Sequence, residues 1–167
     1  MMNLKRLLTR PLVALPSSLV LTILVLAIIG FADATYLTIE HFLNVVPPCS
    51  ITGGCEKVLT SSYAVVLGIP VALLGSIYYL LIIVGCLVYL ESKHISKLDK
   101  HNSEVLRMSL FLVIPGFLAS LGFTALQIFI IHAYCAYCLG SATITTVLLI
   151  LMIYMFWKYG DGLVASG

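Results

Sequence analysis

The sequence predicts an all-α membrane protein, a bundle of four transmembrane helices whose large first loop carries a short helical turn. The mean hydropathy of +1.13 lies far above the soluble range, and only 10% of the residues are charged. Four apolar segments are each long enough to cross a hydrocarbon core of about 30 Å as helices. Most of the charged residues fall outside these segments, and Pro47-Pro48 and Gly53-Gly54 in the first connection break a helix.

We expect a single domain over residues 1–167, with spans at about residues 16–42, 68–90, 108–131 and 137–157. Pro70 stands where the second span begins, a position at which a helix tolerates proline. Pro115-Gly116 predicts a kink in the first third of the third span. The basic start and the apolar run before Ala32-Asp33-Ala34 also resemble a cleavable signal peptide, an alternative that an intact-mass measurement would test.

The distribution of Lys and Arg predicts the topology. The two terminal segments and the second connection hold eight of these nine residues, whereas the first connection has only Lys57 and the third has none. By the positive-inside rule, both termini and the second connection face the cytoplasm, and the first and third connections face outward. Membrane topology therefore accounts for the positions of the basic residues, which give no evidence for nucleic-acid binding.

The five cysteines fall into two pairs and one remainder. Cys49 and Cys55 lie in the first connection, and Cys135 and Cys138 lie where the fourth span begins, so all four are expected on the outward face. If the fourth span starts there as a helix, its first turn holds Cys135 and Cys138, and free N–H groups stabilise a thiolate. Cys86 lies inside an apolar run and reads as a small buried side chain.

The C-x-x-C spacing keeps a thiolate and its resolving partner within reach, which favours thiol–disulfide exchange. Two pairs allow three disulfide connectivities. There are two alternatives: structural disulfides without redox activity in an exported loop, or a zinc site made of four thiolates. A carrier of thiophilic metal ions is a further alternative, although its path would need soft ligands inside the membrane, where only Cys86 stands.

A redox pair at the membrane rim needs an electron acceptor. No G-x-G-x-x-G follows a strand pattern, so no dinucleotide site is legible in the sequence. A lipid-soluble quinone within reach of the rim is the acceptor that we expect. It must be strongly oxidising to accept electrons from the more oxidising thioredoxin-fold proteins.

Two polar residues inside the spans are candidate quinone contacts. Asp33 is unusual because a carboxylate at membrane depth costs several kcal/mol unless it is paired or hydrated. It shares a helical face with Tyr36 and Glu40, which predicts a polar stripe toward the bundle. Asp33 is either a structural hydrogen-bonded carboxyl or a proton donor to the quinone. Gln127 either holds helices together or contacts the quinone.

The ordered combination of motifs resembles the vitamin K epoxide reductase family, in its bacterial branch, over essentially the whole chain. The order also separates it from disulfide bond formation protein B, in which the C-x-x-C precedes the separated pair. The matching parts are Cys49 and Cys55, Val-Leu-Thr-Ser-Ser-Tyr at 58–63, Gly-Ile-Pro-Val-Ala-Leu-Leu-Gly at 68–75, and Cys135-Ala-Tyr-Cys138.

The resemblance implies a four-helix bundle that holds a quinone, either ubiquinone or menaquinone, near the outer membrane surface. It implies that Cys135 and Cys138 are the active-site pair, with Cys138 facing the quinone. Cys55 is then the shuttle residue that forms a mixed disulfide with Cys135, and Cys49 meets the external thiol partner. Ser61 matches the family's Ser or Thr near the quinone.

Two departures from the family pattern narrow the expected function. The chain lacks the fused thioredoxin-like domain of many bacterial members, so we expect a separate thioredoxin-fold dithiol protein on the outer side as electron donor and the lipid quinone pool as acceptor. Val71 and Ala142 stand where the animal enzymes have polar residues that bind the vitamin K head group, which weakens the case for an epoxide substrate.

The expected protein is a thiol:quinone oxidoreductase of a bacterial inner or plasma membrane that supports disulfide bond formation. The alternative is an enzyme whose main purpose is quinone or quinone-epoxide reduction.

Overall fold

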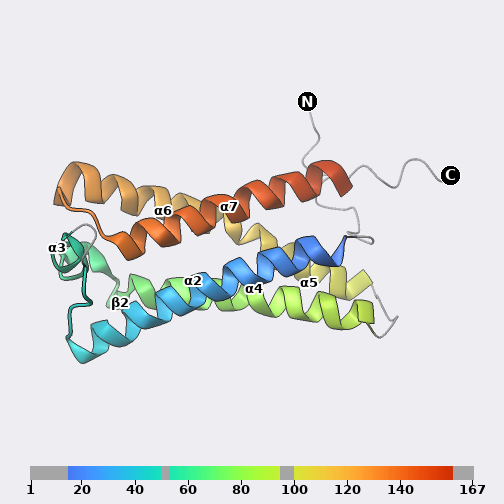
Figure 1. Ribbon diagram of the computed structural model, residues 1–167, viewed down its shortest axis with the longest axis horizontal. Coiled ribbons are helices and arrows are strands. Elements are labelled where there is room, and N and C mark those ends of the chain that lie inside the picture. The colour runs from blue at the N-terminus through green and yellow to red at the C-terminus, as the bar shows by residue number, and fades with distance from the viewer. Residues whose placement is uncertain (1–14, 50–52, 95–99, 160–167) are drawn as a thin grey trace.

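The computed structural model describes residues 15–49, 53–94 and 100–159, and it confirms the predicted all-α bundle (Figure 1). Within these residues, four helical segments are long and apolar enough to cross a membrane: Ser17–Leu43, Val71–Glu91, Val105–Ile131 and Ala136–Lys158. Large apolar side chains remain exposed along their outer faces, including Leu21, Val25, Ile28 and Ile29 on the first. A helix surface of this kind is suited to lipid rather than to water.

The spans are built from six helical elements. The first span is α2 (Ser17–Leu43), the second is α4 (Val71–His94), and the fourth is α7 (Ala136–Tyr159). The third combines α5 (Lys100–Phe111), α6 (Val113–Leu126) and a π-helical turn, η2 (Gln127–Ile131). Helix α2 packs along α4 and α6 packs along α7, while α2 also contacts α7 (Figure 1).

The kink predicted from Pro115-Gly116 is a break at Leu112, three residues before the proline. Proline has no N–H, and its ring clashes with the carbonyl four residues earlier, which belongs here to Phe111. Helix α5 ends at that residue, and the Gly116 N–H donates to the Leu112 carbonyl at 3.1 Å as α6 begins. The proline therefore acts one turn ahead of its own position.

Helices α4 and α5 both run beyond the span ends expected at residues 90 and 108. Helix α4 continues to His94 and α5 begins at Lys100, so most of the polar second connection is helical. A helix satisfies its own backbone hydrogen bonds, so it need not end where the hydrocarbon ends.

The first connection carries the expected short helix, α3 (Cys55–Leu59), followed by a 3₁₀ turn, η1 (Ser62–Ala64). A small antiparallel hairpin then joins β1 (Val65–Val66) to β2 (Ile69–Pro70), which the sequence analysis did not predict. Its two-residue turn has Leu67 at φ 53° and Gly68 at φ 81°. Two consecutive positive φ angles are characteristic of a tight type I′ hairpin turn.

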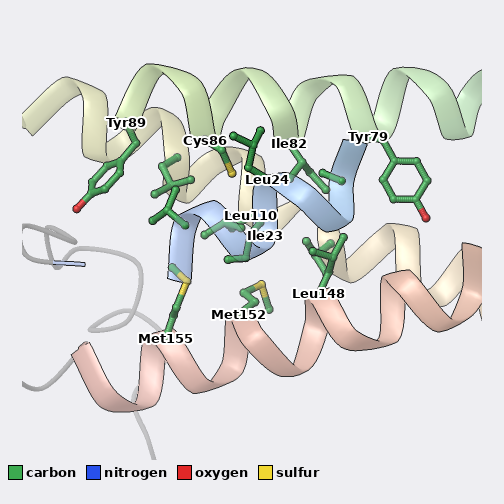
Figure 2. Packing of buried hydrophobic residues seen from close by; sticks show 14 of the residues in the cluster. Ile23, Leu24, Tyr79, Ile82, Cys86, Tyr89, Leu110, Leu148, Met152 and Met155 are labelled. Carbon is green, nitrogen blue, oxygen red and sulfur yellow. The ribbon is translucent and has the colours of Figure 1, made fainter. Parts of the chain in front are cut away.

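The hydrophobic core lies in the half of the bundle remote from α3, between α2, α4, α5 and α7 (Figure 2). Figure 2 shows Cys86 of α4 inside this core, near Leu24 of α2, and its side chain is fully buried. At the far end of this core the Tyr89 hydroxyl accepts a hydrogen bond from the Leu15 N–H at 3.2 Å. Cys86 thus lies in the core, outside the cluster in which the other cysteines gather.

Candidate active site

The four loop cysteines gather at one end of the bundle, where α3 lies beside the turn from η2 to α7 (Figure 1). Cys55 and Cys135 are both completely buried, and they share one packed group with Val58, Ile131 and Ala133, here called the cysteine cluster. Cys49 and Cys138 pack against its edge. Residues from two distant parts of the chain therefore form a single sulfur-rich contact.

The two cysteine pairs differ in redox state. Cys49 and Cys55 form a disulfide with a Cα–Cα distance of 5.8 Å, whereas Cys135 and Cys138 are free thiols. A zinc site of four thiolates would need all four sulfurs unbonded to one another, and in this state two of them are joined. An oxidised pair packed against a reduced pair is the arrangement that thiol–disulfide exchange requires.

The two cysteine-bearing turns are in contact through their backbones. A Cβ placed on Gly54 would lie 2.7 Å from the carbonyl oxygen of Tyr134 and 2.8 Å from its nitrogen. Only glycine allows this approach, and each of the two contacting residues directly precedes a cysteine. A hydrogen bond also joins the two parts of the site: the Tyr137 hydroxyl donates to the carbonyl of Pro48, the residue before Cys49, at 3.1 Å.

Gly54→Ala is expected to push the two turns apart, because the added methyl group meets backbone atoms that cannot rotate away. Overpacking of this kind costs about 1–3 kcal/mol. We expect electron transfer from Cys55 to Cys135 to slow by roughly tenfold or more, because a free-energy change of 1 kcal/mol already alters an equilibrium constant about fivefold. Stopped-flow mixing with a reduced protein dithiol measures it. The matched control is Gly140→Ala on α7, where an added Cβ meets no described atom within 4 Å; equal losses in both variants would contradict the prediction.

Cys135 is the cap residue that precedes the fourth helix. The sequence predicted instead that it would lie within the first turn of that helix. Helix α7 begins at Ala136, and the Leu139 N–H donates to the Cys135 carbonyl at 3.0 Å, closing the first helical turn. The N–H groups of Tyr137 and Cys138 donate to the Cys135 sulfur. These are the second and third residues of the helix, whose N–H groups a capping side chain normally satisfies.

The pKa of Cys135 lies below that of an ordinary cysteine. A hydrogen bond from the Cys138 thiol, supported by the two backbone N–H groups, lowers the pKa of Cys135 to about 7, against the opposing effect of burial. A thiolate is the nucleophilic form of cysteine. Cys135 is therefore half ionised near neutral pH, and Cys138 is the thiol that donates to it.

Alkylation of Cys135 in the fully reduced protein is expected to reach its plateau rate above a pH of about 7. Below that value the rate should fall about tenfold per pH unit, because only the thiolate reacts. Mass spectrometry of the Cys135 peptide after timed iodoacetamide pulses measures the inflection. In Cys138→Ala the inflection should move upward, because the strongest stabilising hydrogen bond is gone. An inflection that stays put in that variant, or one near 8.5 in the parent, would contradict this account.

Gln127 holds the turn that presents Cys135. Its side chain is 1% exposed, and its Oε1 accepts a hydrogen bond from the Cys135 N–H at 2.8 Å. Its own carbonyl accepts from the Ala133 N–H at 3.2 Å, where η2 ends. Helix packing and quinone contact were the two roles predicted for this residue, and a bond to Cys135 was not predicted. No local signal indicates a π-helical turn, which rotates the last residues of the span relative to an α-helix.

A cavity of about 750 Å³ opens between the helices beside the cysteine cluster. Among the four loop cysteines, only Cys138 lines it, so the cavity begins where the sulfur cluster ends. The predicted contacts Ser61, Gln127 and Asp33 all line it as well, in a wall that is otherwise mostly apolar. The Ser61 hydroxyl donates to the Val58 carbonyl at 2.7 Å.

Three polar atoms of residues in the cavity wall lack a hydrogen-bond partner within the described part of the chain, although all are buried. They are the Oδ2 of Asp33, the Oε2 of Glu40 and the hydroxyl of Tyr78. Leaving such an atom unsatisfied costs about 1–3 kcal/mol, so a bound molecule is the natural partner. Tyr78 was not among the predicted contacts; its signal is a Tyr-Tyr pair inside an apolar span, where each hydroxyl needs a partner.

The fold and the site define an integral membrane protein in which a disulfide and a dithiol lead into an apolar cavity between transmembrane helices. The chain belongs to the vitamin K epoxide reductase family, whose family model matches residues 21–153. Members of this family are oxidoreductases that act in membranes through cysteines and use quinones, and this chain is an enzyme of that kind. No curated protein sequence matches the chain.

Proposed function

We propose that the protein is a thiol:quinone oxidoreductase that supports disulfide bond formation in exported proteins. The observation that carries the proposal is the order of the sulfur atoms in space. Cys55 and Cys135 are buried together in the cysteine cluster, and Cys138 lines the cavity that adjoins it. Electrons that enter at the loop disulfide thus have a continuous path to the cavity.

The relay consists of two disulfide exchanges. A thiolate of the external dithiol attacks Cys49, which releases Cys55 as a thiolate, and the partner's second thiol then forms the partner's own disulfide. Cys55 attacks Cys135 of an oxidised inner pair and releases Cys138; the Cys49 thiolate then restores the Cys49–Cys55 bond. Each exchange breaks one S–S bond and makes another, so two electrons move without gain or loss. The described state, with the loop pair oxidised and the inner pair reduced, follows this second exchange.

The cavity fits a quinone. Its volume lies within the usual range of about 300–1,000 Å³ for small-molecule sites, and its wall is largely apolar with few polar groups. The Tyr78 hydroxyl has no partner within the described residues, and it can donate to a carbonyl oxygen, the polar group that all quinone rings share. Gln127 and Ser61 already make hydrogen bonds within the chain, so they shape the wall beside the ring. A bound quinone would supply a two-electron acceptor beside Cys138.

The orientation is inferred from charge, and the donor and acceptor are inferred from the resemblance to the family. The cysteine end of the bundle carries only Lys57, whereas the Lys- and Arg-rich segments belong to the other connection and the termini. The cysteines then face the oxidising side of a bacterial inner or plasma membrane, with both termini in the cytoplasm. A separate thioredoxin-fold dithiol protein is the donor, and ubiquinone or menaquinone of the lipid pool is the acceptor.

The test mixes the purified protein with a reduced thioredoxin-fold protein and a short-chain benzoquinone, and follows the quinone absorbance. We expect one quinone reduced for each partner disulfide formed. Quinone reduction with small dithiols, but with no thioredoxin-fold protein, would instead favour a dedicated quinone or quinone-epoxide reductase. Absence of quinone reduction with every thiol donor would overturn the proposal.

A further inference from the structure

Three helices each place one polar side chain in the cavity wall next to Cys138. They are Asp33 from α2, Tyr79 from α4 and Ser141 from α7. The Tyr79 and Ser141 hydroxyls are hydrogen-bonded to each other at 2.8 Å, and Tyr79 also donates to the Ser141 carbonyl at 3.2 Å. Asp33 is close enough to act electrostatically on Tyr79 and on both thiols of the inner pair. This polar group lies in a wall whose surface is largely apolar.

Asp33 is the member of the group with unused hydrogen-bonding capacity. Its Oδ2 is buried and has no partner within the described residues. No Lys or Arg lines the described cavity wall; its titratable groups are Asp33 and Cys138, with Glu40, His41 and Tyr63 from α2 and the first loop, and Tyr78 and Tyr79 from α4. A charged carboxylate at membrane depth without a cation costs several kcal/mol, so this site favours a neutral Asp33 that carries a proton.

Quinone reduction needs two electrons and two protons, and the inner thiol pair does not supply both protons. The hydrogen bonds that the Cys138 thiol and the two helix N–H groups donate to the Cys135 sulfur favour its thiolate, so only the Cys138 thiol brings a proton into the cavity. The second proton has to come from another group in the wall. The described wall holds two carboxyl groups, and Asp33 rather than Glu40 is the one that acts electrostatically on the inner thiols.

We propose that Asp33 donates the second proton to the quinone as Cys135 and Cys138 join in a disulfide. This inference rests on the proposed function and names the acid within the same site. The two sulfurs lose two electrons and the Cys138 proton as the S–S bond forms. Asp33 loses its proton and becomes a carboxylate, and the quinone is reduced to the quinol. One negative charge is present before the step, on Cys135, and one after it, on Asp33, which then recovers a proton from water.

A single-turnover experiment tests this role. The protein is reduced with a small dithiol, freed of excess reductant and mixed with a short-chain benzoquinone, and the quinone absorbance is followed between pH 6 and 9. Asp33→Asn should slow quinol formation by about 10²-fold or more, the usual contribution of a positioned general acid. Its rate should also fall more steeply with rising pH, because its second proton comes from solvent. Asp33→Glu should recover part of the rate.

An infrared difference spectrum of the same reaction gives a readout independent of rate. The parent should lose the carbonyl band of a protonated carboxyl group on quinone reduction, and Asp33→Asn should lack this change. The control is Thr22→Ala on the same helix, whose hydroxyl bonds only the Ser18 carbonyl and should leave rate and spectrum unaltered. Retention of the Cys135 alkylation inflection near pH 7 shows that the Asp33 variants keep the fold of the site.

The outcomes separate this inference from the proposed function. A parent that fails to reduce quinone overturns the function itself. A parent that works, together with an Asp33→Asn variant of equal rate and pH dependence, overturns the role of Asp33 alone. A loss that is the same at every pH, is not relieved by Asp33→Glu and leaves the carboxyl band in place assigns Asp33 a structural role and also overturns the inference.

Discussion

Cys138→Ala is expected to reduce quinone turnover to the uncatalysed background, with small and protein dithiols alike. Cys138 is the only one of the four loop cysteines that lines the cavity, so its removal leaves no sulfur at the electron acceptor. Residues that act as one catalytic unit fail together when any member is lost. Cys135→Ala should therefore be equally inactive, although its sulfur lies in the cysteine cluster rather than in the cavity wall.

A double variant, Cys49→Ala with Cys138→Ala, should also accumulate a Cys55–Cys135 disulfide under mild oxidation, because both thiols that could resolve it are absent. Non-reducing peptide mapping detects this bond. Cys86→Ala is the matched control, because Cys86 also has apolar neighbours but lies in the core between α2 and α4, away from the cysteine cluster. Its rate should equal that of the parent. Quinone turnover that persists in Cys138→Ala would remove the basis of the relay.

Cys49→Ala and Cys55→Ala should each abolish the oxidation of protein dithiols while leaving a small dithiol as a substrate. A protein partner is too large to reach Cys135, which is completely buried beneath α3, and it depends on the loop pair. A small dithiol can reach the inner pair through the cavity that Cys138 lines. The disulfide joins residues only six apart, so its loss should cost less stability than a bond closing a longer loop.

Parallel assays with one reduced thioredoxin-fold protein and one small dithiol measure the split between the two substrates. If activity fell to the same degree with both substrates, the loop pair would not precede the inner pair in the electron path. Thiol labelling in intact cells is a separate check on direction. Reaction of Cys49 or Cys135 with a reagent confined to the cytosol would contradict the outward orientation.

The parts of the fold that depend on composition and spacing were predictable. Long apolar runs fix four spans because nothing in hydrocarbon can satisfy a backbone except its own helix. Pro115 broke the third span as expected, although at Leu112, because the proline ring acts on the carbonyl four residues earlier. The hairpin from Val65 to Pro70 was missed, because two-residue strands contain too little alternation to show a period.

The candidate site was predictable only as a set of residues. Asp33 and Gln127 were chosen as polar residues within apolar spans and Ser61 from the resemblance to the family, and all three line the cavity. The bond from Gln127 to the Cys135 N–H was not foreseeable, because it depends on a π-helical turn and a short connection. Tyr78 gave no periodic signal, since a tyrosine in a buried helix face resembles any other large apolar residue.

The sequence by itself determined that this chain lies in a membrane and where its redox chemistry resides, since apolar length and cysteine spacing are local properties. Only the tertiary structure decided the order in which the sulfurs meet. The contact of Gly54 with Tyr134 and the burial of Cys55 beside Cys135 join segments about 80 positions apart. The packing of helices decides such contacts, and no property of either segment alone specifies them.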